Sequence, residues 1–252
     1  MHPAYSVILF TTASGMGYGM LTLLGLVGVN HGQASSLGFG LTTMIVALGL
    51  VTIGLLSSTL HLGRPERAWR AFSQWRSSWL SREGIAAVVT YVPALLFGLM
   101  WSGLVEAPQW IAPLGIVTAV MALITIYCTG KIYATLTPIR AWNQPLTVPV
   151  YFAFGLASGA TLLAAISSLF GRFQFFMAIV TVALLLVAIV LKFRYWRAID
   201  NAPRDRTMED ATGLGRIGKV ANGKCRILPR IISRRKWAMP WPASMRRSCG
   251  MA

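Results

Sequence analysis

Long apolar stretches alternate with short polar connectors along most of this chain. A bilayer core about 30 Å thick is crossed by roughly 20 apolar residues in an α-helix. Six stretches reach that length, at residues 5–29, 37–60, 84–105, 109–130, 146–170 and 173–193. We therefore predict an all-α fold, a polytopic transmembrane helix bundle of six spans in residues 1–193. A basic, irregular connector and tail in residues 194–252 are expected to follow it.

Small and aromatic residues within these spans support the prediction. Gly15 and Gly19 form one small-xxx-small pair, and Gly155 and Gly159 form another; such pairs let two helices approach closely. Aromatic side chains gather near the predicted span ends, as in the aromatic belts of membrane proteins. They are Trp101, Trp110, Trp142, Tyr195 and Trp196. We expect the glycines to serve helix packing and the aromatic residues to mark the membrane interface.

The composition excludes several classes of protein. Of the 252 residues, 55% are hydrophobic and 12% are charged, whereas a soluble domain carries about 25% charged residues. An ordinary soluble enzyme, a disordered chain and a disulfide scaffold are therefore excluded. Much of the net charge of +16 lies in residues 194–252, which hold 14 Lys and Arg against 4 Asp and Glu. Because six spans precede it, this tail is expected to meet lipid headgroups or soluble partners rather than nucleic acid.

The connectors at the two ends of the predicted bundle differ in charge. Connectors 61–83 and 131–145 lie on one side and together carry seven Lys and Arg, and the basic tail follows on that side. The connectors on the opposite side carry one basic residue, Arg172. Cytoplasmic connectors are enriched in Lys and Arg, so we predict that the Arg-rich side and the N-terminus are cytoplasmic.

The chain offers few residues for holding a metal. Its three cysteines are too few for an iron–sulfur cluster with four cysteine ligands. A haem with two histidine ligands would need two of the three histidines, and His2 and His31 lie at segment ends. We therefore predict that the chain binds no metal or haem of its own.

The connector between the second and third spans has an amphipathic pattern. Trp69, Phe72 and Trp75 recur at every third position, and Arg67 lies off that stripe. This pattern is typical of a helix that lies in the membrane interface, with its aromatic side chains turned toward lipid or protein. Pro65 suits the first turn of such a helix.

Two ionisable residues flank this connector. His61 closes the second predicted span and Glu83 opens the third, so both lie at the depth of the membrane interface. An ionisable side chain there costs free energy unless it has a function or pairs with another group. A quinone headgroup also lies at this depth, and its redox change moves two electrons and two protons. The imidazole can exchange one proton near neutral pH and the carboxyl can relay the other, while Arg64 steadies the site. The alternative is a structural one, in which His61 and Glu83 pair and cap their helices.

A longer motif surrounds these residues. Residues 58–65 read Ser-Thr-Leu-His-Leu-Gly-Arg-Pro, Arg67-Ala68 follows, and residues 80–83 read Leu-Ser-Arg-Glu. This motif resembles the signature of the dimethyl sulfoxide reductase membrane-anchor subunit family, and the likeness extends over about residues 1–220. The resemblance implies a non-catalytic anchor subunit that holds an iron–sulfur electron-transfer subunit and a molybdopterin catalytic subunit at the membrane.

The resemblance also implies a site and a location. Family members exchange electrons with menaquinol or ubiquinone without a haem of their own, in anaerobic respiratory electron transport in the inner (plasma) membrane of bacteria. Their quinol-site residues include the histidine and the glutamate that match His61 and Glu83. We expect Arg64 and Arg67 to tune that site or to dock the partner. The menaquinone or ubiquinone is then an exchangeable substrate.

Three alternatives stay open at this point. Similar anchors serve sulfite-oxidising complexes that reduce quinone, so the direction of electron flow is open. A multi-span transporter would have charged or discontinuous segments inside its spans, and no charged residue lies deep within the six predicted spans. A haem-bearing cytochrome subunit would show a Soret band in its optical spectrum.

The end of the chain departs from the family pattern. The resembled family has eight spans, whereas six are predicted here, and residues 221–252 are rich in Arg, Trp and Pro without periodicity. Read from the third base of the Lys236 codon, the codons of residues 236–247 permit Met-Gly-Tyr-Ala-Leu-Ala-Arg-Lys-His-Ala-Ala, an ordinary helical segment. We therefore expect a C-terminally truncated or frameshifted product.

Overall fold

The chain folds into a bundle of long helices. The computed structural model describes residues 5–59 and 65–201. Six α-helices there are long and apolar enough to cross a membrane, which confirms the predicted fold class. They are α1 Tyr5–His31, α2 Leu37–Thr59, α3 Trp79–Trp101, α4 Ile111–Ala134, α5 Thr147–Leu169 and α6 Phe175–Asp200. Two short 3-10 helices, η1 Pro65–Gln74 and η2 Pro108–Trp110, precede α3 and α4.

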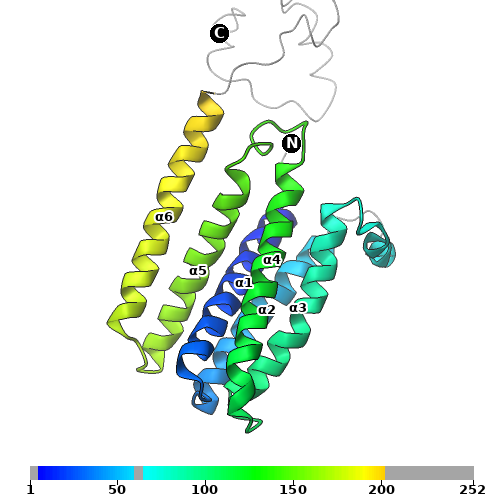
Figure 1. Cartoon of the computed structure of the whole chain (residues 1–252). Coiled ribbons are helices and arrows are strands. Elements are labelled where there is room, and N and C mark those ends of the chain that lie inside the picture. The colour runs from blue at the N-terminus through cyan, green and yellow to red at the C-terminus, as the bar shows by residue number, and fades with distance from the viewer. Residues whose placement is uncertain (1–4, 60–64, 202–252) are drawn as a thin grey trace, which may run out of the picture. The chain divides into compact units, whose positions relative to one another are not determined.

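Helix α1 lies in the middle of the bundle (Figure 1). It packs against α2, α4 and α5, while α3 packs mainly against α4 and α6 packs mainly against α5. Helices α2 and α3 are joined by the Arg-rich connector but share few contacts. Most large apolar side chains of α6 are exposed, as expected for a helix whose outer surface meets lipid.

Glycines set the closest helix crossings. A Cβ on Gly19 of α1 would collide with the main-chain carbonyl of Gly155 in α5, and one on Gly159 would collide with the α1 backbone at Gly19 and Met20. The backbones therefore touch where the sequence has no side chain, as in other small-xxx-small contacts. This confirms the packing role predicted for Gly19, Gly155 and Gly159, whereas a Cβ on Gly15 would meet nothing within 4 Å.

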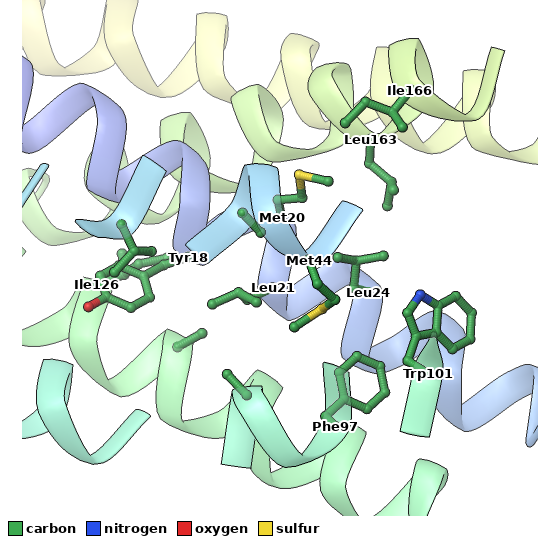
Figure 2. Close-up of a cluster of buried hydrophobic side chains, with 14 of the residues drawn as sticks. Tyr18, Met20, Leu21, Leu24, Met44, Phe97, Trp101, Ile126, Leu163 and Ile166 are labelled. Carbon is green, nitrogen blue, oxygen red and sulfur yellow. The ribbon is translucent and has the colours of Figure 1, made fainter. Parts of the chain in front are cut away.

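Large side chains fill the space between these crossings. Tyr18, Met20, Leu21 and Leu24 project from α1 into a buried apolar cluster (Figure 2). Trp101 belongs to that cluster: only 3% of it is exposed, and its ring stacks on Phe97 with the centroids 5.8 Å apart. The expectation that Trp101 belongs to an interfacial belt is therefore wrong, because its side chain packs inside the buried cluster rather than facing outward.

Three helices extend beyond the predicted spans by four residues or more. Helix α3 begins at Trp79 rather than at 84, α4 ends at Ala134 rather than at 130, and α6 ends at Asp200 rather than at 193. Each extension carries polar or basic residues that lower the local hydropathy without interrupting the helix. In α6, for example, the Tyr195 hydroxyl donates to the main-chain carbonyl of Ala141 at 2.6 Å. Hydropathy therefore marks the apolar core of each helix but not its full length.

Several predictions concern residues outside the described ranges. His61 and Arg64 lie between the end of α2 and the start of η1, in residues 60–64. The predicted irregular connector and tail begins at residue 194, but α6 continues to Asp200, so that part of the prediction is wrong. The rest of the tail and the predicted frameshift concern residues 202–252, which also lie outside. These expectations stay predictions.

Candidate functional site

The predicted amphipathic helix is present as η1, which is a 3-10 helix rather than an α-helix. A 3-10 helix has three residues per turn, so side chains three positions apart lie on one face. Trp69 and Phe72 share that face, and Trp75 continues the stripe just beyond the helix end. All three are exposed, to 65%, 41% and 52%. Arg67 lies within η1, and the structure describes its backbone only.

Helix η1 is held against the start of α3. A Cβ on Gly84 would lie 3.1 Å from the ring of Phe72, so that ring covers the glycine. The guanidinium group of Arg82 donates to the main-chain carbonyls of Trp75 at 2.9 Å and Arg76 at 2.6 Å. These contacts fix where the connector ends and α3 begins.

Aromatic rings and cations form a cluster beside this junction. Trp79 of α3 and Tyr127 of α4 meet edge to face, with their ring centroids 5.8 Å apart. Arg82 lies over the Trp79 ring at 4.4 Å, and the Lys131 ammonium lies 5.9 Å from Trp79 and 5.6 Å from Tyr127. Such cation–π contacts keep positive charge at the interface, where anionic groups can reach it.

Glu83 lies deeper than the sequence indicates. It was expected to open the third span at interfacial depth, but α3 begins four residues earlier, which places Glu83 in the second turn with 4% of its surface exposed. Its Oε1 atom has no hydrogen-bond partner within the described part of the chain. A buried carboxyl without full hydrogen bonding is costly, so Glu83 is a candidate site residue.

Thr129 of α4 lies beside the Glu83 carboxyl. The Thr129 hydroxyl also lies 3.0 Å from the main-chain oxygen of Thr125, to which it donates. A hydroxyl carries a single hydrogen, so Thr129 cannot donate to both groups at once. When it donates to Thr125, its oxygen can accept a hydrogen bond from a protonated Glu83, and this arrangement suits a carboxyl that gains and loses a proton.

Other buried hydroxyls lie on α1, α3 and α4. Tyr18 of α1 is 1% exposed, interacts electrostatically with Glu83, and has no hydrogen-bond partner for its hydroxyl in residues 5–59 and 65–201. Deeper in the bundle, the hydroxyls of Thr90 and Thr125 lie 3.2 Å apart across the contact between α3 and α4. Sequence reasoning missed these residues, although Thr90 follows Glu83 by seven positions and so lies on the same helix face.

The structure thus places one of the four predicted site residues, Glu83, in a buried polar cluster. Arg67 lies on η1 at the same end of the bundle. Since His61 and Arg64 are outside the described residues, their approach to Glu83 stays a prediction. Residues 5–59 and 65–201 contain no group of three or more side chains suited to a metal, and the expectation of no bound metal likewise stays a prediction.

Comparison with known proteins identifies the family. The family model described as DMSO reductase anchor subunit (DmsC) matches residues 1–204. The chain belongs to the DMSO reductase anchor subunit family. This anchor-family protein is 36% identical over 235 residues to a sulfite dehydrogenase subunit of Allochromatium vinosum, with 85% of the chain and 70% of that relative covered.

Two further relatives of this anchor-family protein are more distant. A polypeptide of the anaerobic dimethyl sulfoxide reductase of Haemophilus influenzae is 28% identical, with 62% of the chain and 56% of that relative covered. Protein NrfD of Escherichia coli is 26% identical, with 63% of the chain and 57% of that relative covered. The match therefore spans little more than half the length of these two relatives. No solved structure matches the chain.

Proposed function

We propose that this anchor subunit exchanges electrons between the membrane quinone pool and an iron–sulfur electron-transfer subunit. The observation that carries the proposal is the buried Glu83 carboxyl, whose Oε1 atom has no partner in the described part of the chain and which lies one turn inside the Arg-rich end of the bundle. In a bilayer, quinol headgroups lie at about this depth. Their hydroxyl groups can donate hydrogen bonds to the Oε1 atom of Glu83.

The proton chemistry follows from the residue types. Oxidation of a quinol releases two electrons and two protons. In the proposed site, the His61 imidazole takes one proton from a headgroup hydroxyl. Glu83 takes the other and passes it toward water, with Thr129 holding the carboxyl in place. Arg64 and Arg67 stabilise negative charge on the headgroup or dock the partner. Quinone reduction uses the same groups in the opposite direction.

The proposed partners are an iron–sulfur subunit and a molybdopterin catalytic subunit, both bound at the Arg-rich end. The names of the relatives favour two directions of electron flow. A dimethyl sulfoxide reductase implies a complex that consumes quinol, whereas a sulfite dehydrogenase implies one that reduces quinone. The relative with the higher identity carries the second name, which favours a sulfite-oxidising complex for this protein over the dimethyl sulfoxide reductase-like complex of anaerobic respiration.

The proposed location is the bacterial inner (plasma) membrane. Six apolar helices make the chain an integral membrane protein. The orientation rests on the charge of the connectors, which favours a cytoplasmic Arg-rich end. Fusion of a reporter enzyme that is active on only one side of the membrane to the 30–36 or the 131–145 connector tests that orientation directly.

The function is tested by replacing Glu83 in the assembled complex. Glu83→Gln keeps the shape and removes the exchangeable proton, and we expect it to lower turnover with a soluble ubiquinol or menaquinol analogue by about 100-fold. Glu106→Gln is the matched control, because Glu106 is exposed at the other end of the bundle. Co-purification of the partner subunits shows whether the variants assemble. Unchanged turnover in both directions of electron flow in an assembled Glu83→Gln complex contradicts the proposal.

A further inference from the structure

Tyr18 of α1 carries a hydroxyl inside the bundle. Its side chain is 1% exposed and belongs to the buried apolar cluster. Figure 2 shows the hydroxyl at the end of the ring that points away from Leu24, and therefore toward the first turns of α1. A helical side chain usually leans this way, toward the N-terminus of its helix. Helices α1 and α3 both begin at the Arg-rich end of the bundle (Figure 1), so the Tyr18 hydroxyl points toward the end at which Glu83 lies.

Tyr18 and Glu83 interact electrostatically, and each has a polar atom without a partner. The Tyr18 hydroxyl and the Oε1 atom of Glu83 are both buried and form no hydrogen bond within the described ranges. Leaving a buried hydroxyl unpaired costs free energy, and a phenylalanine would fill the same space without that cost. Packing alone therefore does not account for a tyrosine at this position. Its hydroxyl can donate, and the carboxylate oxygen can accept, so each atom supplies what the other lacks.

Two other donors near the Glu83 carboxyl are already engaged. The Thr129 hydroxyl donates its hydrogen to the main-chain oxygen of Thr125 at 3.0 Å. The guanidinium group of Arg82 is held by two main-chain carbonyls of the connector and lies over the Trp79 ring at 4.4 Å. Thr129 is thus placed to accept a hydrogen bond from the protonated carboxyl. The ionised carboxyl needs a donor instead, and the hydrogen of the Tyr18 hydroxyl is not engaged.

Two further ionisable groups, both on α4, interact electrostatically with Glu83. Cys128 is buried, but a thiol is only a weak hydrogen-bond donor. Tyr133 is partly exposed, and its ring stacks on that of Tyr151 with the centroids 5.4 Å apart. Tyr133 therefore has solvent as an alternative partner, which the buried Tyr18 lacks.

We propose that Tyr18 is a positioning residue of the quinol site, whose hydroxyl donates a hydrogen bond to the Oε1 atom of Glu83 while that carboxyl is ionised. The proposal rests on the proton transfer proposed above for Glu83. When the Glu83 carboxylate takes a proton from a quinol hydroxyl, the bond from Tyr18 breaks. When the carboxyl passes that proton toward water, the bond forms again, and Tyr18 keeps its own proton throughout. A donor to the charged form favours that form, so Tyr18 helps Glu83 to release its proton.

The pairing is tested without quinone by infrared spectroscopy of the purified full chain. For each protein, subtracting the spectrum of the same protein with Glu83→Gln isolates the carbonyl band of the protonated carboxyl, which is followed as the pH is raised. We expect Tyr18→Phe, which keeps the ring, to hold this band to a pH about one unit higher than the parent does, because the charged form loses one hydrogen bond. Tyr5→Phe is the matched control, since Tyr5 is 87% exposed at the start of the same helix. An unshifted band in Tyr18→Phe, or an equal shift in Tyr5→Phe, overturns the proposal.

Turnover of the assembled complex shows whether Tyr18 acts through Glu83. We expect Tyr18→Phe to lower turnover with a quinol analogue by about tenfold, the effect of one hydrogen bond. Added to Glu83→Gln, it is expected to cause no further loss, because the carboxyl on which it acts is already gone. A further tenfold loss in that double variant overturns the proposal.

The two experiments separate this proposal from the proposed function. Low turnover in Glu83→Gln with an unshifted band in Tyr18→Phe removes Tyr18 from the site and leaves the role of Glu83 standing. Parent-like turnover in Glu83→Gln with a shifted band in Tyr18→Phe contradicts the role of Glu83, and with it the role of Tyr18 in turnover, although the two side chains pair.

Discussion

Gly19 in α1 lies directly against the main-chain carbonyl of Gly155 in α5, with no room for a Cβ between them. Gly15, one turn earlier on α1, has open space where its Cβ would be. A methyl group therefore fits at Gly15 but not at Gly19, although both glycines belong to one small-xxx-small pair. This difference allows the helix contact to be tested within a single turn of α1.

Gly19→Ala is expected to destabilise the bundle by about 1–3 kcal/mol, because α1 and α5 must separate to admit the methyl group. Gly15→Ala is expected to be neutral or stabilising by up to about 1 kcal/mol, because alanine favours a helix over glycine. Thermal unfolding in detergent, followed by the fluorescence of the tryptophans, measures both. Equal melting temperatures for the two variants contradict the proposed contact.

His61→Ala is expected to abolish quinol-driven turnover and to leave the partner subunits bound. The reason is that the imidazole is the group proposed to take the first proton from the headgroup. Steady-state assays with a quinol analogue measure turnover, and co-purification measures assembly. Parent-like turnover removes His61 from the mechanism.

Arg67→Gln separates the two roles proposed for the arginines of the connector. If Arg67 docks the partner, the variant loses partner subunits in proportion to its loss of turnover. If it tunes the quinol site, the complex stays intact and KM for the quinol analogue rises by roughly tenfold, the effect of one charge-assisted hydrogen bond. An intact complex with unchanged kinetics shows that Arg67 does neither.

Thr129→Val removes the hydroxyl beside the Glu83 carboxyl while keeping the volume of the side chain nearly unchanged. We expect turnover to fall about tenfold, which corresponds to the loss of one hydrogen bond. Thr129→Ser restores the hydroxyl and is expected to restore turnover. A merely structural role would leave the pH profile of turnover unchanged, so a shifted profile in Thr129→Val is the distinguishing result.

Tyr91→Phe tests the link between α2 and α3. The Tyr91 hydroxyl lies 2.7 Å from that of Thr52 on α2, and the two helices share few other contacts. Removing the hydroxyl is expected to cost about 0.6 kcal/mol, the average for hydrogen bonds between membrane helices. Chemical unfolding in detergent measures this loss, and Thr52→Val is expected to give a similar value. If the variant with both Tyr91→Phe and Thr52→Val loses twice as much free energy of unfolding as either single variant, the two hydroxyls do not interact.

The sequence by itself determined that the described part of this membrane protein is all-α with six spans, because each segment alone supplies the roughly 20 apolar residues that a helix needs to cross a bilayer. It also determined the amphipathic pattern of η1, the packing role of Gly19, Gly155 and Gly159 and, through a short motif, the family. Each of these properties depends on residues close together in the chain.

Only the tertiary structure decided how deeply Glu83 is buried, that Tyr18 and Thr129 are its neighbours and that Trp101 faces inward. Hydropathy predicts the start of the third span at 84 because Ser81, Arg82 and Glu83 are polar. The helix nevertheless begins at Trp79, since Arg82 is held by main-chain carbonyls and Trp79 by Tyr127. The approach of Tyr18 to Glu83 likewise depends on α1 and α3 both packing against α4. These properties arise from contacts between distant segments, which no local pattern contains.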